Sequence, residues 1–95
     1  MTKSDRIKLR SIGQDLADTS FVGKDGITEN VIKQISDNLT AHELVKIKVQ
    51  KNAPLEISEI AEEIAKSCEA EVVTIIGSKI LLYRFSTKEK VKHVL

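Results

Sequence analysis

The segment from Phe21 to Thr28, FVGKDGIT, has the residue types and spacing that best suit the binding of an anion. Gly23 and Gly26 frame Lys24 and stand directly before a predicted helix start at Thr28. Backbone N–H groups at a helix N-terminus, together with the positive end of the helix dipole, favour a phosphate group. Glycines permit close approach to the backbone, and Lys24 adds a mobile positive charge. We therefore predict a phosphate-binding loop with RNA as its ligand.

The same segment also has a simpler interpretation, as an ordinary turn that joins a strand to a helix. Asp25 favours this alternative, because a carboxylate repels a phosphate. The repulsion is avoided only if Asp25 points away from the ligand or accepts hydrogen bonds from the Ile27 and Thr28 amides.

Hydrophobic periodicity predicts the elements that lead into this loop. A basic helix is expected over Met1–Asp18, with Ser4 as its N-cap and Gly13 weakening its end. A short strand over Thr19–Val22 should then run directly into the glycine loop.

Beyond the loop, Thr28 is a suitable N-cap for a second helix that ends near Leu39 to His42. The following run, Leu44–Val49, alternates between apolar residues on one side and a face that carries Lys46 and Lys48. This alternation is typical of a strand with one buried face.

The last part of the chain predicts a helix and a hairpin. Asn52 is a candidate cap for a third, acidic helix with Pro54 in its first turn, where a missing N–H costs nothing. Two apolar runs, Val72–Ile76 and Ile80–Phe85, lie on either side of Gly77 and are expected to pair as a closing hairpin.

Together these elements predict one domain over residues 1–95, with a core at about 4–85 and a basic, frayed tail at 86–95. The order is a helix followed by βαβαββ. This order indicates an α/β fold of the layered α+β kind, in which helices pack on a four-stranded sheet. The sheet should be mixed, because helical crossovers favour parallel pairing and the hairpin is antiparallel.

The net charge of +1 conceals a segregation of charge along the chain. Residues 1–51 carry nine Lys or Arg and seven Asp or Glu (+2), residues 55–71 carry one and six (−5), and residues 72–95 carry five and one (+4). Segregation in space would give one basic face and one acidic back, as in a nucleic-acid binder. The alternative is that these charged residues only form the solvent-exposed faces of helices.

Composition excludes several classes of protein. A hydrophobic share of 41% excludes a mostly disordered chain, and a single cysteine, Cys68, excludes an intramolecular disulfide or a Cys-rich zinc module. No apolar run approaches the roughly 18 residues of a membrane helix. The polar start, Met1–Arg10, does not have the pattern of a signal peptide. We expect a cytoplasmic protein with no membrane partner.

Four landmarks in order resemble the CRM domain, the chloroplast RNA splicing and ribosome maturation fold, in its stand-alone YhbY-like form. They are the GxxG loop followed by Thr in FVGKDGITENVI, the start of the second strand in HELVKIKV, and the Ile-Gly hairpin and the Leu-Tyr-Arg end of VVTIIGSKILLYR. The resemblance implies a compact, non-enzymatic RNA-binding domain whose GxxG loop lies like that of KH domains, which clamp the nucleotide backbone. It also implies association with ribosomes and with precursors of the large subunit.

The expected RNA-binding residues fall into two groups. Loop residues are Gly23, Lys24, Asp25, Gly26 and Thr28, and the basic surface comprises Arg6, Lys8, Arg10, Lys46, Lys48 and Arg84. Tyr83 is expected in the core rather than stacked on a base. With only three aromatic residues in the chain, binding should depend on backbone shape and charge.

Nothing in the sequence indicates catalysis, a metal site, a cofactor or a small-molecule substrate. His42 and Glu43 are neighbours on a turn and do not converge on a substrate, and Cys68 lies on an apolar stripe. The competing function is that of a protein-interaction adaptor, whose acidic helix (Glu59, Glu62 and Glu63) would bind a basic partner such as a large-subunit ribosomal protein. An Alba-like nucleic-acid protein has a similar size, but the HELVK and LYR segments fit it poorly.

Overall fold

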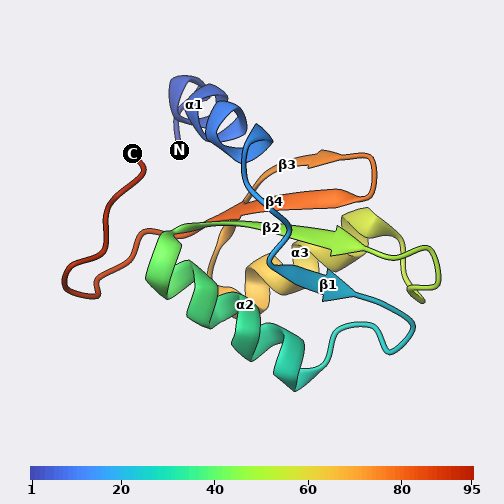
Figure 1. Ribbon diagram of the computed structural model, residues 1–95. Helices are drawn as coiled ribbons and strands as arrows, with labels where there is room; N and C mark the ends of the chain where they lie inside the picture. The colour runs from blue at the N-terminus through green and yellow to red at the C-terminus, as the bar shows by residue number, and fades with distance from the viewer.

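A computed structural model describes residues 1–95 as a mixed four-stranded sheet with helices on both faces (Figure 1). The elements in chain order are α1 (Lys3–Gln14), β1 (Ser20–Val22), α2 (Glu29–His42), β2 (Leu44–Val49), α3 (Ile57–Cys68), β3 (Glu71–Ile76) and β4 (Lys79–Tyr83). This confirms the predicted order. None of the helices has the length and apolarity that crossing a membrane requires.

The strands lie in the order β1-β2-β4-β3. β1 pairs parallel with β2, whereas β2 and β3 each pair antiparallel with β4. The predicted mixed sheet is therefore confirmed. β1 and β2 run in the same direction, and β4 runs antiparallel to β2 and begins where β2 ends. The loops after β1 and β2 therefore lie at the same end of the strands as the β3–β4 turn.

The main core fills the space between the sheet and the helices α2 and α3. Val45, Ile47 and Val49 alternate along β2 toward this side, as the sequence pattern predicts. Ile35 and Leu39 of α2 meet them, and the remaining members come mainly from α3 and β4: Val22, Ile60, Ala61, Ile64, Ala65, Cys68, Ile80 and Leu82. The amphipathic stripe of α3 therefore faces inward and leaves its glutamates in solvent.

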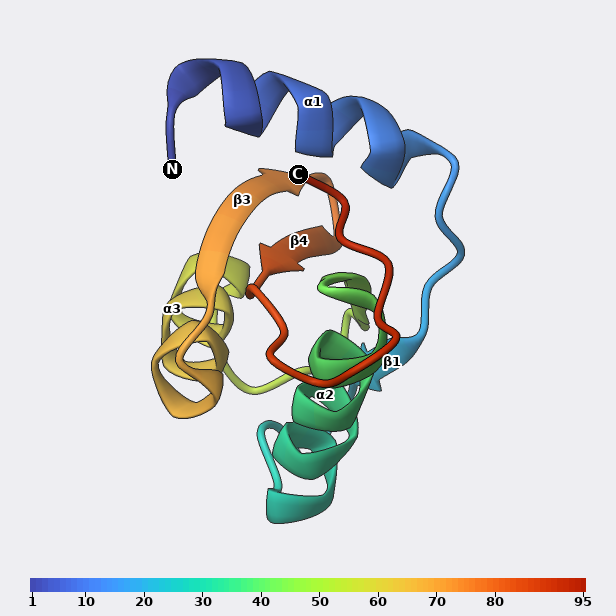
Figure 2. The ribbon, with the colours of Figure 1, turned by 90° about the vertical axis from the view of Figure 1, so that its left-hand side faces the viewer.

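A smaller core lies on the opposite face of the sheet, beneath α1 (Figure 2). It contains Leu9, Leu44, Val73 and Leu81. Gly13 makes this packing possible, because a β-carbon there would lie 2.6 Å from Leu81 Cδ2. The glycine that weakens the predicted helix thus allows a close contact between α1 and the sheet.

Two predicted helix starts are wrong. Helix α1 is capped by Thr2 rather than Ser4, because the Thr2 hydroxyl accepts from the Asp5 amide at 3.0 Å and the Asp5 carboxylate accepts from the Thr2 amide. Helix α3 begins at Ile57, so Asn52 and Pro54 belong to the loop before it. The Pro54 ring lies next to the glycine loop, with its Cγ 3.1 Å from the position that a β-carbon on Gly26 would occupy.

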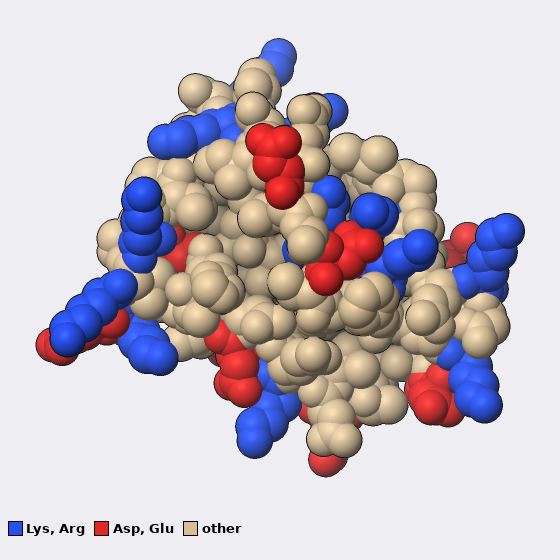
Figure 3. Space-filling model, in the orientation of Figure 1, with Lys and Arg blue, Asp and Glu red and all other residues tan.

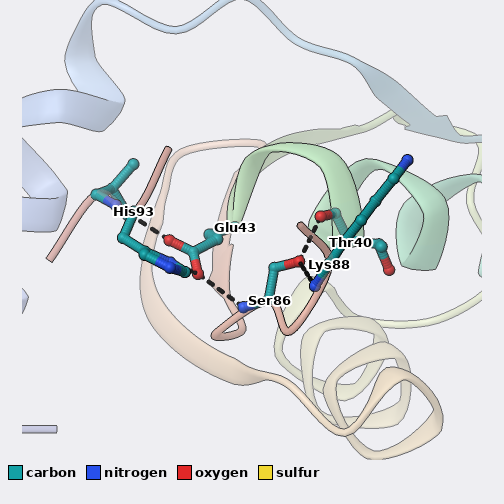
Figure 4. Close-up of polar contacts among 6 residues, drawn as sticks. Thr40, Glu43, Ser86, Lys88 and His93 are labelled. Atoms are coloured by element: carbon teal, nitrogen blue, oxygen red, sulfur yellow. Dashed lines mark hydrogen bonds and ion pairs between the residues drawn. The ribbon is translucent and has the colours of Figure 1, made fainter. Parts of the chain in front are cut away.

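The tail is also different from the prediction, because it packs against the domain instead of fraying. Its Ser86 is buried, and the Ser86 amide donates to Glu43 Oε2 at 2.6 Å. His93 Nδ1 lies 2.8 Å from the same oxygen, and the Val94 amide donates to Glu43 Oε1 at 3.0 Å (Figure 4). The tail residues therefore surround a glutamate that is fully buried.

Candidate nucleic-acid interface

The glycine loop forms a tight turn between the end of β1 and the start of α2. The Gly26 amide donates to the Gly23 carbonyl at 2.9 Å, and Gly26 has a φ of 67°, in the left-handed region that favours glycine. Thr28 caps α2, as predicted, by accepting from the Val31 amide at 3.1 Å. The turn and the cap together connect the loop backbone to the start of α2.

Most amides of this segment remain free. Those of Lys24, Asp25 and residues 27–30 donate no hydrogen bond within the protein, whereas the Val31 and Ile32 amides bond to Thr28. These free donors precede and include the first turn of α2, at the positive end of its dipole. Asp25 accepts no hydrogen bond from the Ile27 or Thr28 amide, so these amides have no partner within the protein. Of the two ways to avoid phosphate repulsion, only an Asp25 side chain that points away into solvent remains.

The loop forms one wall of an open cleft. The cleft is lined by Phe21, Gly23, Lys24, Asp25, Gly26, Thr28, Val31, Gln50 and Asn52. A β-carbon at Gly23 would lie 2.7 Å from Gln50 Oε1, so the glycine leaves room for this amide. The two glycines therefore serve different purposes, since Gly26 supplies the turn and Gly23 keeps the cleft open.

The basic residues predicted from the sequence fall into free and engaged groups. Lys8, Arg10, Lys24 and Lys48 are exposed. Lys46 is half-buried and its ammonium donates to the Leu16 carbonyl at 3.3 Å.

Two arginines also bind the protein's own carbonyl oxygens. Arg6 Nη1 donates to the carbonyls of Val72 and Val73, at 3.0 and 3.2 Å, beside the irregularity in β3. Arg84 donates to the carbonyls of Ser36 and Cys68, each at 2.8 Å, and also to the hydroxyls of Ser36 and Thr40. It thereby ties the end of α3 to the middle of α2, a role that accounts for its charge without RNA.

The remaining candidates have structural roles. Cys68 is buried, and burial raises the pKa of its thiol despite the opposing charge of Arg84, so the residue packs as the sequence predicts. Tyr83 is partly buried against the small core under α1, which confirms the expected core position. Glu43 follows α2 in a left-handed conformation with φ of 66°, and its amide closes the helix on Leu39.

Sequence reasoning missed an exposed aromatic beside the loop. The side chain of Phe21 is 51% exposed, and Phe21 pairs with Lys48 across β1 and β2. Paired residues of parallel strands project to the same face, and Lys48 in turn pairs with Lys79 of β4. The exposure of Phe21 could have been predicted from the alternation of side chains along a strand, because a buried Val22 places Phe21 on the opposite, exposed face.

The two charged helices lie on opposite faces of the sheet. Helix α1, with its lysines and arginines, covers one face, and the acidic α3 covers the other (Figure 2). On the face seen in Figure 3, Lys and Arg atoms gather between α1 and β1, with some acidic atoms beside them. Lys79 of β4 forms an ion pair with Asp18 at 3.3 Å. The sheet therefore separates the basic α1 from the acidic α3, while acidic groups such as Asp18 also lie on the α1 side.

Comparison with known proteins decides which family has this arrangement. The family model of the CRS1/YhbY (CRM) domain matches residues 1–84. The chain belongs to the CRM family. The expected resemblance is thus confirmed over nearly the whole chain.

Relatives of this CRM protein occur in bacteria and archaea. It is 38% identical over 82 residues to the probable RNA-binding protein YqeI of Bacillus subtilis, covering 86% of this chain and 85% of that protein. It is 44% identical over 78 residues to a probable RNA-binding protein of Methanocaldococcus jannaschii, covering 80% of this chain and 58% of that longer protein.

A solved structure shares the fold of this CRM domain. The solution structure of the hypothetical protein SAV1595 from Staphylococcus aureus, proposed to bind RNA, superposes with a TM-score of 0.79. The two chains are 38% identical, and the match covers 95% of this chain and 94% of the other.

Proposed function

We propose that this chain is an RNA-binding protein that grips the sugar-phosphate backbone at its glycine loop. The observation that carries the proposal is the row of free amides at Lys24, Asp25 and residues 27–30, on a hydrogen-bonded turn at a helix N-terminus. Such amides bind phosphate oxygens without regard to sequence. Lys24 adds a positive charge at the same place.

Exposed cations extend the interface beyond the loop. Lys48 lies on the neighbouring strand, and Lys8 and Arg10 project from α1 on the same face of the sheet. Arg6, Lys46 and Arg84 are left out of the proposed interface, because they bind carbonyl oxygens of the protein. Relatives named as RNA-binding proteins support RNA as the ligand.

The proposed setting is the cytoplasm, and the proposed RNA is that of the large ribosomal subunit or its precursor. The CRM family resemblance supports this choice, and large-subunit proteins are candidate neighbours of the bound domain. Crosslinking in cells, followed by sequencing of the attached RNA, tests it directly. Enrichment of ribosomal precursor over transfer and messenger RNA supports the assembly role, whereas an even distribution supports only general RNA binding.

Reversing the charge of the loop tests the site itself. Lys24→Glu should weaken binding of a short oligoribonucleotide by roughly tenfold and reduce the slope of log affinity against log salt by about 1, because one phosphate contact is lost. Fluorescence anisotropy at several salt concentrations measures both quantities.

The matched control is Lys66→Glu, which makes the same charge change at an exposed position on α3. It should leave affinity and slope nearly unchanged. In parallel, amide resonances of residues 24–30 should shift on titration with RNA. A shift confined to some other surface, with these amides unmoved, would exclude the loop as the binding site.

A further inference from the structure

Phe21 is one of several large apolar residues that are exposed, and it is the one among them that lines the cleft of the glycine loop. Half of its surface is open to solvent, while Ser20 and Val22 on either side are fully buried. Phe21 pairs with Lys48 in the register of β1 and β2, so its side chain projects from the face of the sheet opposite the main core. Phe21 is also one of the residues that line the same cleft as the glycine loop.

Two side-chain amides line the cleft together with Phe21. The carbonyl oxygens of Gln50 and Asn52 lie within 2.7 and 3.8 Å of the position that a β-carbon of Gly23 would occupy. A carboxamide offers both hydrogen-bond donors and an acceptor, which is what the edge of a nucleobase requires. Phe21, Gln50 and Asn52 therefore place an aromatic face and two adaptable polar groups next to the free loop amides.

We propose that this cleft holds one unpaired nucleotide of the RNA, whose base stacks on Phe21 while Gln50 and Asn52 contact its edge. The inference rests on the proposed function, since the loop amides and Lys24 would bind the phosphate of the same nucleotide. A base in a duplex is stacked on both faces and paired along one edge, so it does not reach such a cleft. The positive charges of Lys24 and Lys48 beside the cleft favour a nucleic acid over an apolar peptide.

The test compares two ligands of equal length and charge. One is an oligouridylate of about ten nucleotides, and the other is the same ribose-phosphate chain with every base absent. Phe21→Ala should weaken binding of the oligouridylate by roughly 5- to 150-fold and leave binding of the abasic chain unchanged, because stacking needs a base. Phe21→Tyr should retain most of the affinity.

A second exposed aromatic provides the matched control. The side chain of Phe85 is 59% exposed, and Phe85 follows β4 near the opposite end of α2, where it stacks on His93 at 4.6 Å. Phe85→Ala should not change the affinity for either ligand. Urea unfolding of each variant checks that the fold is retained.

The outcomes separate this inference from the proposed function. If Phe21→Ala changes neither affinity while Lys24→Glu still weakens both, base stacking is excluded and backbone binding stands. Equal loss for the two ligands would also overturn the inference, since the ring would then only support the loop. If the wild type binds neither ligand, both proposals fall.

Discussion

Glu43 joins three parts of the protein through a single residue. Its amide ends α2 by donating to Leu39 O at 2.8 Å, and its carbonyl accepts from the Arg84 amide at 2.9 Å. Its buried carboxylate accepts from the tail at Ser86 and Val94. Burial alone raises the pKa of this carboxyl, but the hydrogen bonds from the Ser86 amide, the His93 ring and the Val94 amide outweigh burial, and the pKa lies below its usual value of 4.5.

Glu43→Gln should lower the free energy of unfolding at neutral pH by about 1–3 kcal/mol, because an amide cannot replace both carboxylate acceptors. The lowered pKa means that the ionised form stabilises the fold above pH 4.5 and that this contribution disappears as the pH falls through the folded-state pKa. The difference in free energy of unfolding between the variant and the wild type should therefore become smaller at acidic pH. Urea titrations at a series of pH values measure it.

Glu69→Gln is the matched control for this prediction. Glu69 also follows a helix in the left-handed region, with a φ of 55°, but its side chain is exposed. Its replacement should change stability by less than about 0.5 kcal/mol at any pH. An equal pH dependence in both variants would show that the buried network is not responsible.

The loop was the most predictable part of the candidate site, because its residues are contiguous and each has a local reason to be there. Gly26 needs a positive φ and Thr28 needs to cap a helix. The engagement of Arg84 was not predictable, since its acceptors Ser36 and Cys68 are distant in sequence. In a sequence, an arginine at the end of a strand gives no indication of whether its side chain faces solvent or binds two carbonyl oxygens of neighbouring helices.

At the scale of elements, the position of α1 depends on a missing side chain. Gly13→Ala would improve helix propensity by about 1 kcal/mol but place a methyl group against the buried side chain of Leu81. The clash should prevail, with a net loss of about 1–3 kcal/mol in the free energy of unfolding. Chemical denaturation followed by circular dichroism measures the change.

Ser11→Ala gives the corresponding change at an exposed position of the same helix. It should be neutral or stabilise the protein by a few tenths of a kcal/mol, as propensity alone requires. If Gly13→Ala behaved in the same way, the close contact between α1 and β4 would not be limiting.

Periodicity identified every helix and strand, because each buries a face with its own repeat. The ends were less predictable. Asn52 and Pro54 have the chemistry of a helix start, yet they lie in the loop before α3, close to Gly23 and Gly26. The tail carries too few apolar residues to predict its packing, and its attachment depends on Glu43, which lies far away in sequence.

At the scale of the whole molecule, the sheet separates the proposed RNA-binding face from the acidic α3. The triple change of Glu59, Glu62 and Glu63 to Gln should therefore alter RNA affinity by less than about threefold at physiological salt, where charges more than about 8 Å apart are largely screened. The slope of log affinity against log salt should stay near roughly −3, as four phosphate contacts would give. Anisotropy titrations at several salt concentrations test both expectations.

The adaptor alternative predicts the opposite pattern. If α3 binds a basic protein, the triple variant should lose capture of ribosomal proteins while Lys24→Glu retains it. Retained capture in the triple variant, together with lost RNA binding in Lys24→Glu, would assign the activity to the loop face alone.

The long-range attachment of the tail has a consequence for synthesis of the protein on the ribosome. Glu43 leaves the exit tunnel well before its partners Ser86, His93 and Val94, so the nascent domain holds a carboxylate that has no partners. Burying an unpaired charge is costly, so the carboxylate should stay hydrated and keep the junction of α2 and β2 open. The domain should therefore complete its fold only after Val94 has also left the tunnel, and a chain stalled before that point would expose a target for proteases.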